Sequence, residues 1–276
     1  MEEITAEYAA EDLAQAVELR VKPKVTVACK SDLGRVRENN EDKLEFFLPE
    51  DERLLATRGQ VFVVCDGMGG HAAGQIASEL TCKTFIDVYL NHPAELVQTA
   101  MRAGVQAANR FVNDVARAVP SRKGMGTTCT ALVLLQDEAY TVHVGDSRAY
   151  RLRAGELTQL TSDHTWCDEA IRSGMLTPEE AEVHPYRHVL TRAVGTEETL
   201  PVDVEAHGLQ VGDTFLLCSD GLTNHVKDEE IAELLALAPS EAVWKLVGQA
   251  LVGGGSDNCT ALVVRVDALE TQSSSL

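Results

Sequence analysis

The sequence predicts a layered α/β fold in which mainly antiparallel sheets are covered by helices. Apolar, β-branched runs of strand length lie in the first quarter of the chain and recur from residue 128 onwards, with two long helical stretches between them. Links as short as 136–138 and 154–155 join successive strands of the second group, which favours antiparallel neighbours. Strands, a helical pair, more strands and terminal helices fit a layered sandwich better than a doubly wound parallel sheet.

Each element follows from local hydrophobic spacing. Residues 61–65 have the composition of a buried strand, whereas the apolar residues between 72 and 118 recur at helical spacing with one interruption, at Asn91-His-Pro93. The two helices formed by this stretch should cover a sheet with their apolar faces. The predicted elements are strands 25–29 and 61–65, helices 72–90 and 94–118, strands 128–135, 139–146, 148–153 and 214–218, helices 228–237 and 240–252, and strand 259–266.

The chain is expected to contain one catalytic domain, over residues 24–268, because no linker rich in proline, glycine or serine divides it. The acidic residues 1–23 carry only a weak helical pattern, which includes Ile4 and Leu13, and they predict an N-terminal extension. Residues 269–276 are expected to form a C-terminal tail.

Composition narrows the class of protein. A chain of 276 residues that is 45% hydrophobic can bury a sizeable core. The formal net charge of −19 argues against nucleic-acid and anionic-membrane partners, which need basic surfaces, and no apolar run is long enough to cross a bilayer. The acidic N-terminus is unlike a secretory signal, and the seven cysteines form no C-x-x-C pair. We therefore expect a cytoplasmic monomer without disulfides.

The chain is organised around the loop that begins at Asp66. A buried strand ends there at an acid, and glycines at 67, 69 and 70 leave room for a ligand to approach the backbone. Residues 67–72 also fit the loose dinucleotide fingerprint G-x-G-x-x-G/A, but the carboxylate of Asp66 would face the phosphates unless a cation intervened. Taken alone, the loop favours a plain glycine turn whose acid complements a helix dipole.

Three more acids are presented in the same way. Asp146 and Asp220 each follow an apolar strand, and Asp257 precedes one. Converging carboxylates repel one another and raise each other's pKa unless cations lie between them. Oxygen ligands favour hard ions, so Mg²⁺ or Mn²⁺ is expected rather than zinc. His184 and His188 lack further ligands at metal spacing, which makes a zinc site there the weaker alternative.

A different mechanism is suggested by Cys29. Cys29 and Arg35 have the C-x5-R spacing of cysteine-dependent phosphatases. Asp32 would place an anion inside the phosphate cradle, however, and nothing nearby in the sequence indicates a depressed thiol pKa. A cysteine-dependent phosphatase therefore stays open as an alternative, together with a non-catalytic phosphopeptide-binding module.

Six motifs, in order, resemble those of bacterial metal-dependent protein phosphatases of type 2C. They are Ser31-Asp-Leu-Gly-Arg-Val-Arg37-Glu-Asn-Asn-Glu41-Asp42, Asp66-Gly-Met-Gly-Gly-His71, Gly124-Met-Gly-Thr-Thr128, Gly145-Asp-Ser-Arg148, Cys218-Ser-Asp-Gly221 and Asp257-Asn258. The match runs from about residue 25 to residue 266 and is far more specific than any single motif. The resemblance implies a four-layer αββα sandwich with a metal pair at one end, and a flap over about 161–195 beside the active site.

The resemblance also implies roles for individual residues. Asp66 would bridge two ions, Gly67 would contribute its backbone carbonyl, and Asp220 and Asp257 would complete the ligands of the second ion. A water between the ions would ionise and attack phosphorus in line, without a covalent enzyme intermediate. Arg37 occupies the position that binds the substrate phosphate, for which a planar guanidinium is suited.

The resemblance also implies supporting roles for further acidic residues of the motifs. Glu41 and Asp42 match an acidic pair in which Asp42 would hold a metal-bound water. Asp146, together with the Asp of the Ser-Asp-Gly motif, would hold a third, weaker ion. The sequence departs from the family's eukaryotic pattern at Met68, where a histidine follows Asp-Gly. Methionine transfers no proton, so a metal-bound water, or else His71, is expected to protonate the leaving group.

These observations predict a protein serine/threonine phosphatase that hydrolyses phosphoserine and phosphothreonine and uses two Mn²⁺ or Mg²⁺ ions, with a third as an additional expectation. The expected partners are phosphorylated proteins, and the enzyme would oppose a Ser/Thr kinase. A histidine-rich binuclear phosphoesterase would need motifs such as G-N-H, which the corresponding loops lack.

Overall fold

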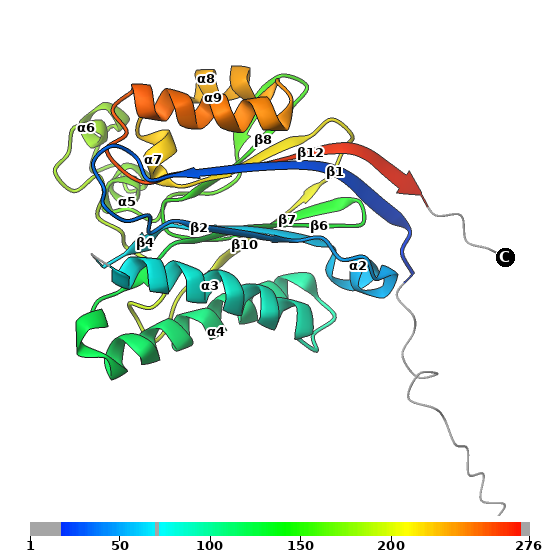
Figure 1. Ribbon diagram of the computed structural model, residues 1–276, viewed down its shortest axis with the longest axis horizontal. Coiled ribbons are helices and arrows are strands. Elements are labelled where there is room, and N and C mark those ends of the chain that lie inside the picture. The colour runs from blue at the N-terminus through cyan, green and yellow to red at the C-terminus, as the bar shows by residue number, and fades with distance from the viewer. Residues whose placement is uncertain (1–17, 70–71, 272–276) are drawn as a thin grey trace, which may run out of the picture.

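Two five-stranded antiparallel sheets stack face to face in the computed structural model, which describes residues 18–69 and 72–271 (Figure 1). The first sheet has the order β1 (Val21–Asp32), β12 (Cys259–Thr271), β11 (Thr214–Cys218), β8 (Arg148–Arg153) and β9 (Glu156–Gln159). The second has the order β10 (Asp203–Gly208), β7 (Glu138–Val144), β6 (Cys129–Leu135), β3 (Gln60–Cys65) and β2 (Lys43–Phe47).

Helices cover the outer face of each sheet. Helices α3 (Ala72–Asn91) and α4 (Val97–Ala118) lie on the second sheet, and α8 (Asp228–Leu235) and α9 (Pro239–Val252) lie on the first (Figure 1). The apolar side chains of α4 recur at helical spacing and are buried against this sheet, as the sequence predicts. The predicted four-layer αββα sandwich is confirmed.

The interface between the two sheets forms a separate apolar layer. Phe62 and Leu132 from the second sheet pack in it with Phe215 and Leu262 from the first, and all four are almost completely buried. Burial of side chains of this size stabilises the fold by about 1.5–3 kcal/mol each. Because β3 lies between this layer and the helices, both of its faces are apolar. This arrangement fixes the end of β3, where Asp66 lies.

The short elements gather at the two ends of the sandwich. Strand β4 (Gly67–Met68) pairs with β5 (Gly126–Thr127) at the end where α7 (Asp220–Thr223) follows β11. Helices α5 (Trp166–Arg172) and α6 (Pro178–Glu182) belong to the flap region and lie at this same end, opposite α2 (Glu52–Arg58) (Figure 1). A 3-10 turn, η1 (Pro120–Arg122), follows α4. The flap region is therefore beside the end of the sandwich that carries Asp66.

Several boundaries differ from the sequence-based prediction. Strand β1 begins at Val21 rather than at residue 25, and β12 continues to Thr271. Strands β2 and β10 and helix α2 were not predicted, because β10 and half of β2 are polar edge segments and α2 has only seven residues. Most of the predicted N-terminal extension, including Ile4 and Leu13, lies outside the described residues. None of the helices within the described ranges has the length and apolarity needed to cross a bilayer.

Candidate metal-binding active site

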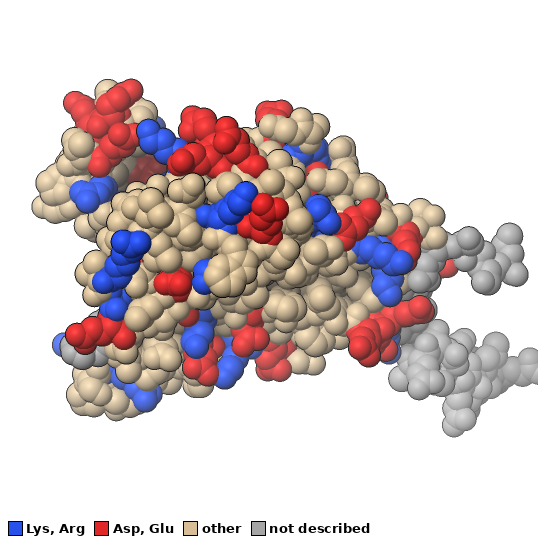
Figure 2. All heavy atoms as spheres, turned by 45° about the horizontal axis from the view of Figure 1, so that its top comes forward, with Lys and Arg blue, Asp and Glu red and all other residues tan. Residues whose placement is uncertain are grey.

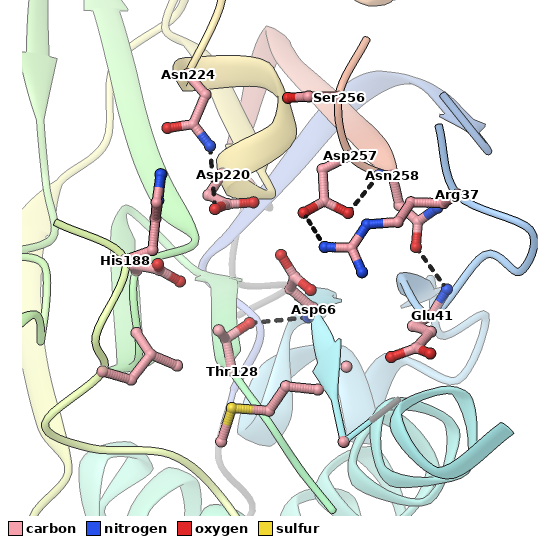
Figure 3. A pocket seen from close by; sticks show the side chains of 15 residues that line it. Arg37, Glu41, Asp66, Thr128, His188, Asp220, Asn224, Ser256, Asp257 and Asn258 are labelled. Carbon is pink, nitrogen blue, oxygen red and sulfur yellow. Dashed lines mark hydrogen bonds and ion pairs between the residues drawn. The ribbon is translucent and has the colours of Figure 1, made fainter. Parts of the chain in front are cut away.

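Four aspartates from four different strand ends line one cavity of about 480 Å³ at this end of the sandwich. Asp66 follows β3, Asp146 follows β7, Asp220 follows β11, and Asp257 precedes β12. Figure 3 shows the carboxylates of Asp66, Asp220 and Asp257 directed toward a common space, with Arg37 on one side of it. The structure therefore brings together the four acids that the sequence singled out.

The backbone around Asp66 is fixed from the neighbouring strand β6. The amide of Asp66 donates to the hydroxyl of Thr128 at 2.8 Å, and the amide of Thr128 donates to the carbonyl of Asp66 at 2.9 Å. A side chain at Gly67 would place its Cβ 2.1 Å from the carbonyl oxygen of Gly74, so only glycine allows this approach of loop and helix. Gly67 lines the cavity, as its predicted role as a carbonyl ligand requires.

Asp220 and Asp257 are held by different partners. Oδ2 of Asp220 accepts from the amide nitrogen of Asn224 at 3.1 Å, whereas its Oδ1 is buried and has no hydrogen-bond partner among the described residues. Oδ2 of Asp257 lies 2.6 Å from Nη2 of Arg37. Arg37 is 52% exposed and lines the cavity, so its guanidinium, which carries five N–H donors, is accessible to a ligand there.

Asn258 ties the Arg37 loop to the Asp257 loop. Its amide nitrogen donates to the carbonyl oxygens of Leu33 and Asn39, and its carbonyl oxygen accepts from the amide of Glu41 at 2.8 Å. One buried side chain therefore determines where the segment with Arg37 and Glu41 lies. The sequence motif included Asn258, but its residue type alone did not reveal this role.

The two residues of the predicted acidic pair, Glu41 and Asp42, lie in different surroundings. Glu41 lines the cavity, whereas Asp42 is buried behind it and borders a separate polar hollow. Oδ2 of Asp42 accepts from the hydroxyl of Ser219 at 2.7 Å, and no hydrogen-bond partner of its Oδ1 lies in the described part of the chain. Burial, together with the charges of Asp220 and Asp257, raises the pKa of Asp42 to about 7.

Electrostatic repulsion disfavours the ionised form of the carboxyl groups in the cavity. Burial, followed by the repulsion of neighbouring carboxylates, raises the pKa of Asp66 well above its usual range. Burial and the charge of Asp220 raise the pKa of Asp146 to about 8, and burial and the charge of Asp257 raise the pKa of Asp220. A cation among these groups would relieve the repulsion and restore ionisation.

The donor set fits a hard divalent ion. The cavity offers carboxylate and carbonyl oxygens, and the buried Oδ1 of Asp220, which has no partner within residues 18–69 and 72–271, adds an acceptor. Within residues 18–69 and 72–271, no three carboxylate, imidazole or thiol groups lie close enough together to hold an ion as they stand. A cation from the chain itself, the guanidinium of Arg37, is bonded to Asp257. The residues therefore fit hard divalent ions, because their donor atoms are oxygens and they line the same cavity.

The outer surface does not supply a broad positive field. In Figure 2, acidic and basic side chains are interspersed on the face that carries α8 and α9. The sequence contains 43 acidic and 24 basic residues. Attraction for an anionic ligand must therefore arise locally, from Arg37 and from bound cations.

Sequence reasoning missed several residues of the site. Thr128 and Ser219 carry hydrogen bonds to Asp66 and Asp42, and both lay inside motifs without an assigned role. His188 lines the cavity from the flap, opposite Arg37 (Figure 3). The only signal for His188 was a histidine in a region expected beside the site. Met68, which stands where the eukaryotic pattern has a histidine, lines the cavity, whereas His71 lies outside the described residues.

The cysteine-dependent alternative is not supported. Cys29 lies on β1 and is not among the residues that line the cavity, and neither is Arg35. Partial burial raises the pKa of the Cys29 thiol, which is the opposite of what a thiolate nucleophile needs. His184 stacks on Trp166 at a ring separation of 4.8 Å, a packing role rather than a zinc site.

Comparison with known proteins agrees with this geometry. The profile of the family described as Protein phosphatase 2C matches residues 37–250. The chain is 40% identical over 248 residues to the serine/threonine protein phosphatase PstP of Mycobacterium tuberculosis. The aligned region covers 90% of this chain but 46% of PstP. The chain therefore spans about half the length of that relative. It is 37% identical over 244 residues to the serine/threonine phosphatase stp of Listeria monocytogenes, covering 86% of this chain and 94% of stp.

A solved structure shows the same fold. The crystal structure of the catalytic domain of PstP in complex with two manganese ions matches with a TM-score of 0.76 at 36% identity, covering 88% of this chain and 99% of that chain. Motif order, fold and the convergence of four strand-end aspartates lead to the same assignment as the profile. The chain belongs to the protein phosphatase 2C family.

Proposed function

We propose that this chain is a metal-dependent phosphatase that hydrolyses phosphoserine and phosphothreonine in other proteins. The observation that carries the proposal is the convergence of Asp66, Asp146, Asp220 and Asp257 in one cavity that also holds Arg37. This combination provides anionic ligands for cations and a guanidinium for a phosphate. PstP and stp are both named serine/threonine phosphatases, and their names, together with the manganese ions of the PstP structure, support the same substrate class and cofactor.

Asp66, Asp220, Asp257 and the carbonyl of Gly67 are the residues that would hold two Mn²⁺ or Mg²⁺ ions. When bound, such a pair activates a water for attack on phosphorus and neutralises charge on the phosphoryl oxygens. Asp66 is suited to the central position, because its backbone is fixed by Thr128 and its side chain faces those of Asp220 and Asp257 (Figure 3). Asp146 lines the same cavity and is the proposed ligand of a third, weaker ion.

Arg37 orients the substrate. Its exposed guanidinium can donate two parallel N–H bonds to phosphoryl oxygens, which places phosphorus over the carboxylates. The segment that carries Arg37 is fixed by Asn258, so the position of the guanidinium depends on the Asp257 loop. Arg37 therefore binds the transferred group rather than the peptide.

The flap over residues 161–195 is proposed to contact the protein substrate, since it supplies His188 and Leu190 to the rim of the cavity. Met68 has no proton to give to the leaving serine or threonine oxygen. We propose that the catalytic domain comprises residues 24–268 together with the paired strand ends that extend it to Val21 and Thr271. We also propose that the enzyme opposes a Ser/Thr kinase in signalling.

Phosphatase assays with control of the metal test the proposal. Activity on a phosphothreonine peptide should disappear with chelator, return with Mn²⁺ or Mg²⁺, and survive alkylation with iodoacetamide. The assay measures released phosphate, with an inactive Asp66→Asn, Asp257→Ala double variant as the background. Activity that resists thorough chelation and is lost on alkylation would overturn the assignment in favour of a thiol mechanism.

A further inference from the structure

The residues on either side of Asp146 and Ser147 are hydrogen-bonded to one dipeptide, Asp163-His164. Asp163 accepts hydrogen bonds from Nε and Nη2 of Arg148 at 2.7–3.0 Å. The amide of Gly145 donates to Nδ1 of His164 at 3.1 Å, and the amide of His164 donates to the carbonyl of Gly145 at 2.7 Å. Both the amide and the carbonyl group of Gly145, the residue directly before Asp146, are therefore hydrogen-bonded to His164.

The hydrogen bonds of His164 define its tautomer. Because Nδ1 accepts from a backbone amide, the ring proton must be on Nε2. Nε2 lies 3.0 Å from Oδ2 of Asp203 on β10, which is the acceptor for that proton. Arg192 lies within 3.2 Å of both Nε2 and Oδ1 of Asp203, but a guanidinium has no acceptor, so Arg192 donates to the carboxylate. The His164 ring is completely buried, and each of its two nitrogens has a hydrogen-bond partner.

Gly145 transmits the position of His164 to the metal-binding groups. It has φ +110°, and a Cβ there would lie 2.5 Å from Cγ2 of Thr128, so the loop is pressed directly against that residue. The hydroxyl of Thr128 accepts from the amide of Asp66 and shares a hydrogen bond of 2.7 Å with Ser147. A rotation of the Gly145 peptide would therefore move Asp146 relative to Asp66.

We propose that His164 and Asp203 form a positioning pair that fixes the Asp146 carboxylate for metal binding through the Gly145 backbone. The inference rests on the proposed function in that Asp146 is taken as a metal ligand. Asp203 is 47% exposed at the edge of the second sheet, so the hydrophobic core does not depend on its side chain. Its carboxylate contacts the buried ring of His164, and that ring contacts the Asp146 loop.

The decisive variants are Asp203→Leu and Asp203→Asn. Leucine removes the acceptor for Nε2–H, whereas the carbonyl oxygen of asparagine retains it. Glu205→Leu is the matched control, because Glu205 lies two residues along the same strand and faces His207 at 3.7 Å, away from the Asp146 loop. His164→Gln is a further variant, and the Asp203 series decides the question if His164→Gln does not fold.

Titration with Mn²⁺, with free ion followed by electron paramagnetic resonance, measures the number and affinity of bound ions. Asp203→Leu should weaken the most loosely bound ion by about 10- to 100-fold, as expected when a group supporting a ligand is lost, and leave the tighter ions within about threefold. Asp203→Asn and Glu205→Leu should bind like wild type, with unfolding temperatures close to it.

Three results would overturn the positioning role. They are unchanged affinity for every ion in Asp203→Leu, an equal loss in Glu205→Leu, and a wild-type protein that binds only the tight pair. The metal titration is independent of phosphatase activity. A wild-type protein without activity would refute the proposed function. An active wild type together with an Asp203→Leu variant of unchanged metal affinity would refute the positioning pair alone.

Discussion

Nη2 of Arg37 lies 2.6 Å from Oδ2 of Asp257, so the proposed phosphate-binding residue is bonded to a proposed metal ligand. This bond holds the pKa of Arg37 above its usual value. The two roles compete, because the guanidinium of Arg37 occupies Oδ2 of Asp257, and an ion at Asp257 would draw on the negative charge of the same carboxylate. Metal binding and phosphate binding should therefore be coupled through this pair.

Arg37→Ala should separate the two roles. Loss of the charged hydrogen bonds to phosphate, about 1.5–3 kcal/mol, should raise KM for a phosphopeptide by about 10- to 150-fold. Affinity for Mn²⁺ should stay unchanged or rise up to about fivefold, because a half-exposed ion pair contributes ~1 kcal/mol or less. Steady-state kinetics and calorimetry with Mn²⁺ measure the two effects.

Arg35→Ala is the matched control for this prediction. It removes an arginine from the same loop, but Arg35 does not line the cavity. It should leave both KM and metal affinity near wild type. A large loss of Mn²⁺ affinity in Arg37→Ala would show that the guanidinium supports the metal site instead of competing with it.

Metal binding should release protons near neutral pH. The pKa of Asp42 is raised to about 7 and that of Asp146 to about 8, so both are substantially protonated at pH 7 when no cation is present. Cations favour the ionised forms, and affinity for Mn²⁺ should therefore increase as pH rises from about 6 to 8. Calorimetry in two buffers with different ionisation enthalpies detects the release, and Asp146→Asn should reduce it. A buffer-independent heat would contradict this prediction.

Elements with strong periodicity were predictable, and the contacts that complete the site were not. The strand before Asp66 was predicted within one residue, because residues 61–65 are all apolar and the next is an acid. Strand β10 was missed because its outer residues are polar, yet it carries Asp203. The contacts of His164 and Asn258 join segments far apart in the sequence, so no local pattern reveals them.

His143 should make stability depend on pH. Burial, and then the neighbouring charge of His164, lower the pKa of His143 to about 3, whereas an unfolded histidine titrates near 6.5. Between these values the unfolded chain binds a proton that the folded chain does not, so stability is complete above about pH 6.5 and is lost as pH falls toward 3. The expected loss is about 1.4 kcal/mol per pH unit below 6.5.

The variant His143→Leu isolates this contribution. The metal-free variant should lose about 2 kcal/mol less stability than the metal-free wild type between pH 7 and pH 5. Thr130 keeps its other hydrogen bond, to the carbonyl of Ser147, in the variant. Urea unfolding at the two pH values measures the difference. Equal losses in both proteins would show that the ring is protonated in the fold.

Asp146→Ala tests whether a third ion serves the leaving group. Asp146 lines the cavity, but the two-ion scheme does not need its carboxylate. A weak ion there would orient or acidify the donor of the leaving-group proton, a task that Met68 cannot perform. The variant should keep the tight metal pair but lose much of kcat, about 10²-fold or more on phosphoserine and clearly less on an activated aryl phosphate, whose leaving group needs no proton.

His188→Gln is the informative comparison for this last prediction, because His188 lines the same cavity from the flap and carries no carboxylate. If Asp146 acts through an ion, only Asp146→Ala shows a loss that depends on the leaving group. A selective loss in His188→Gln would assign the proton to the imidazole instead. Equal losses on both substrates in Asp146→Ala, or none, would mean that Asp146 serves the Gly145–Arg148 turn and not the leaving group.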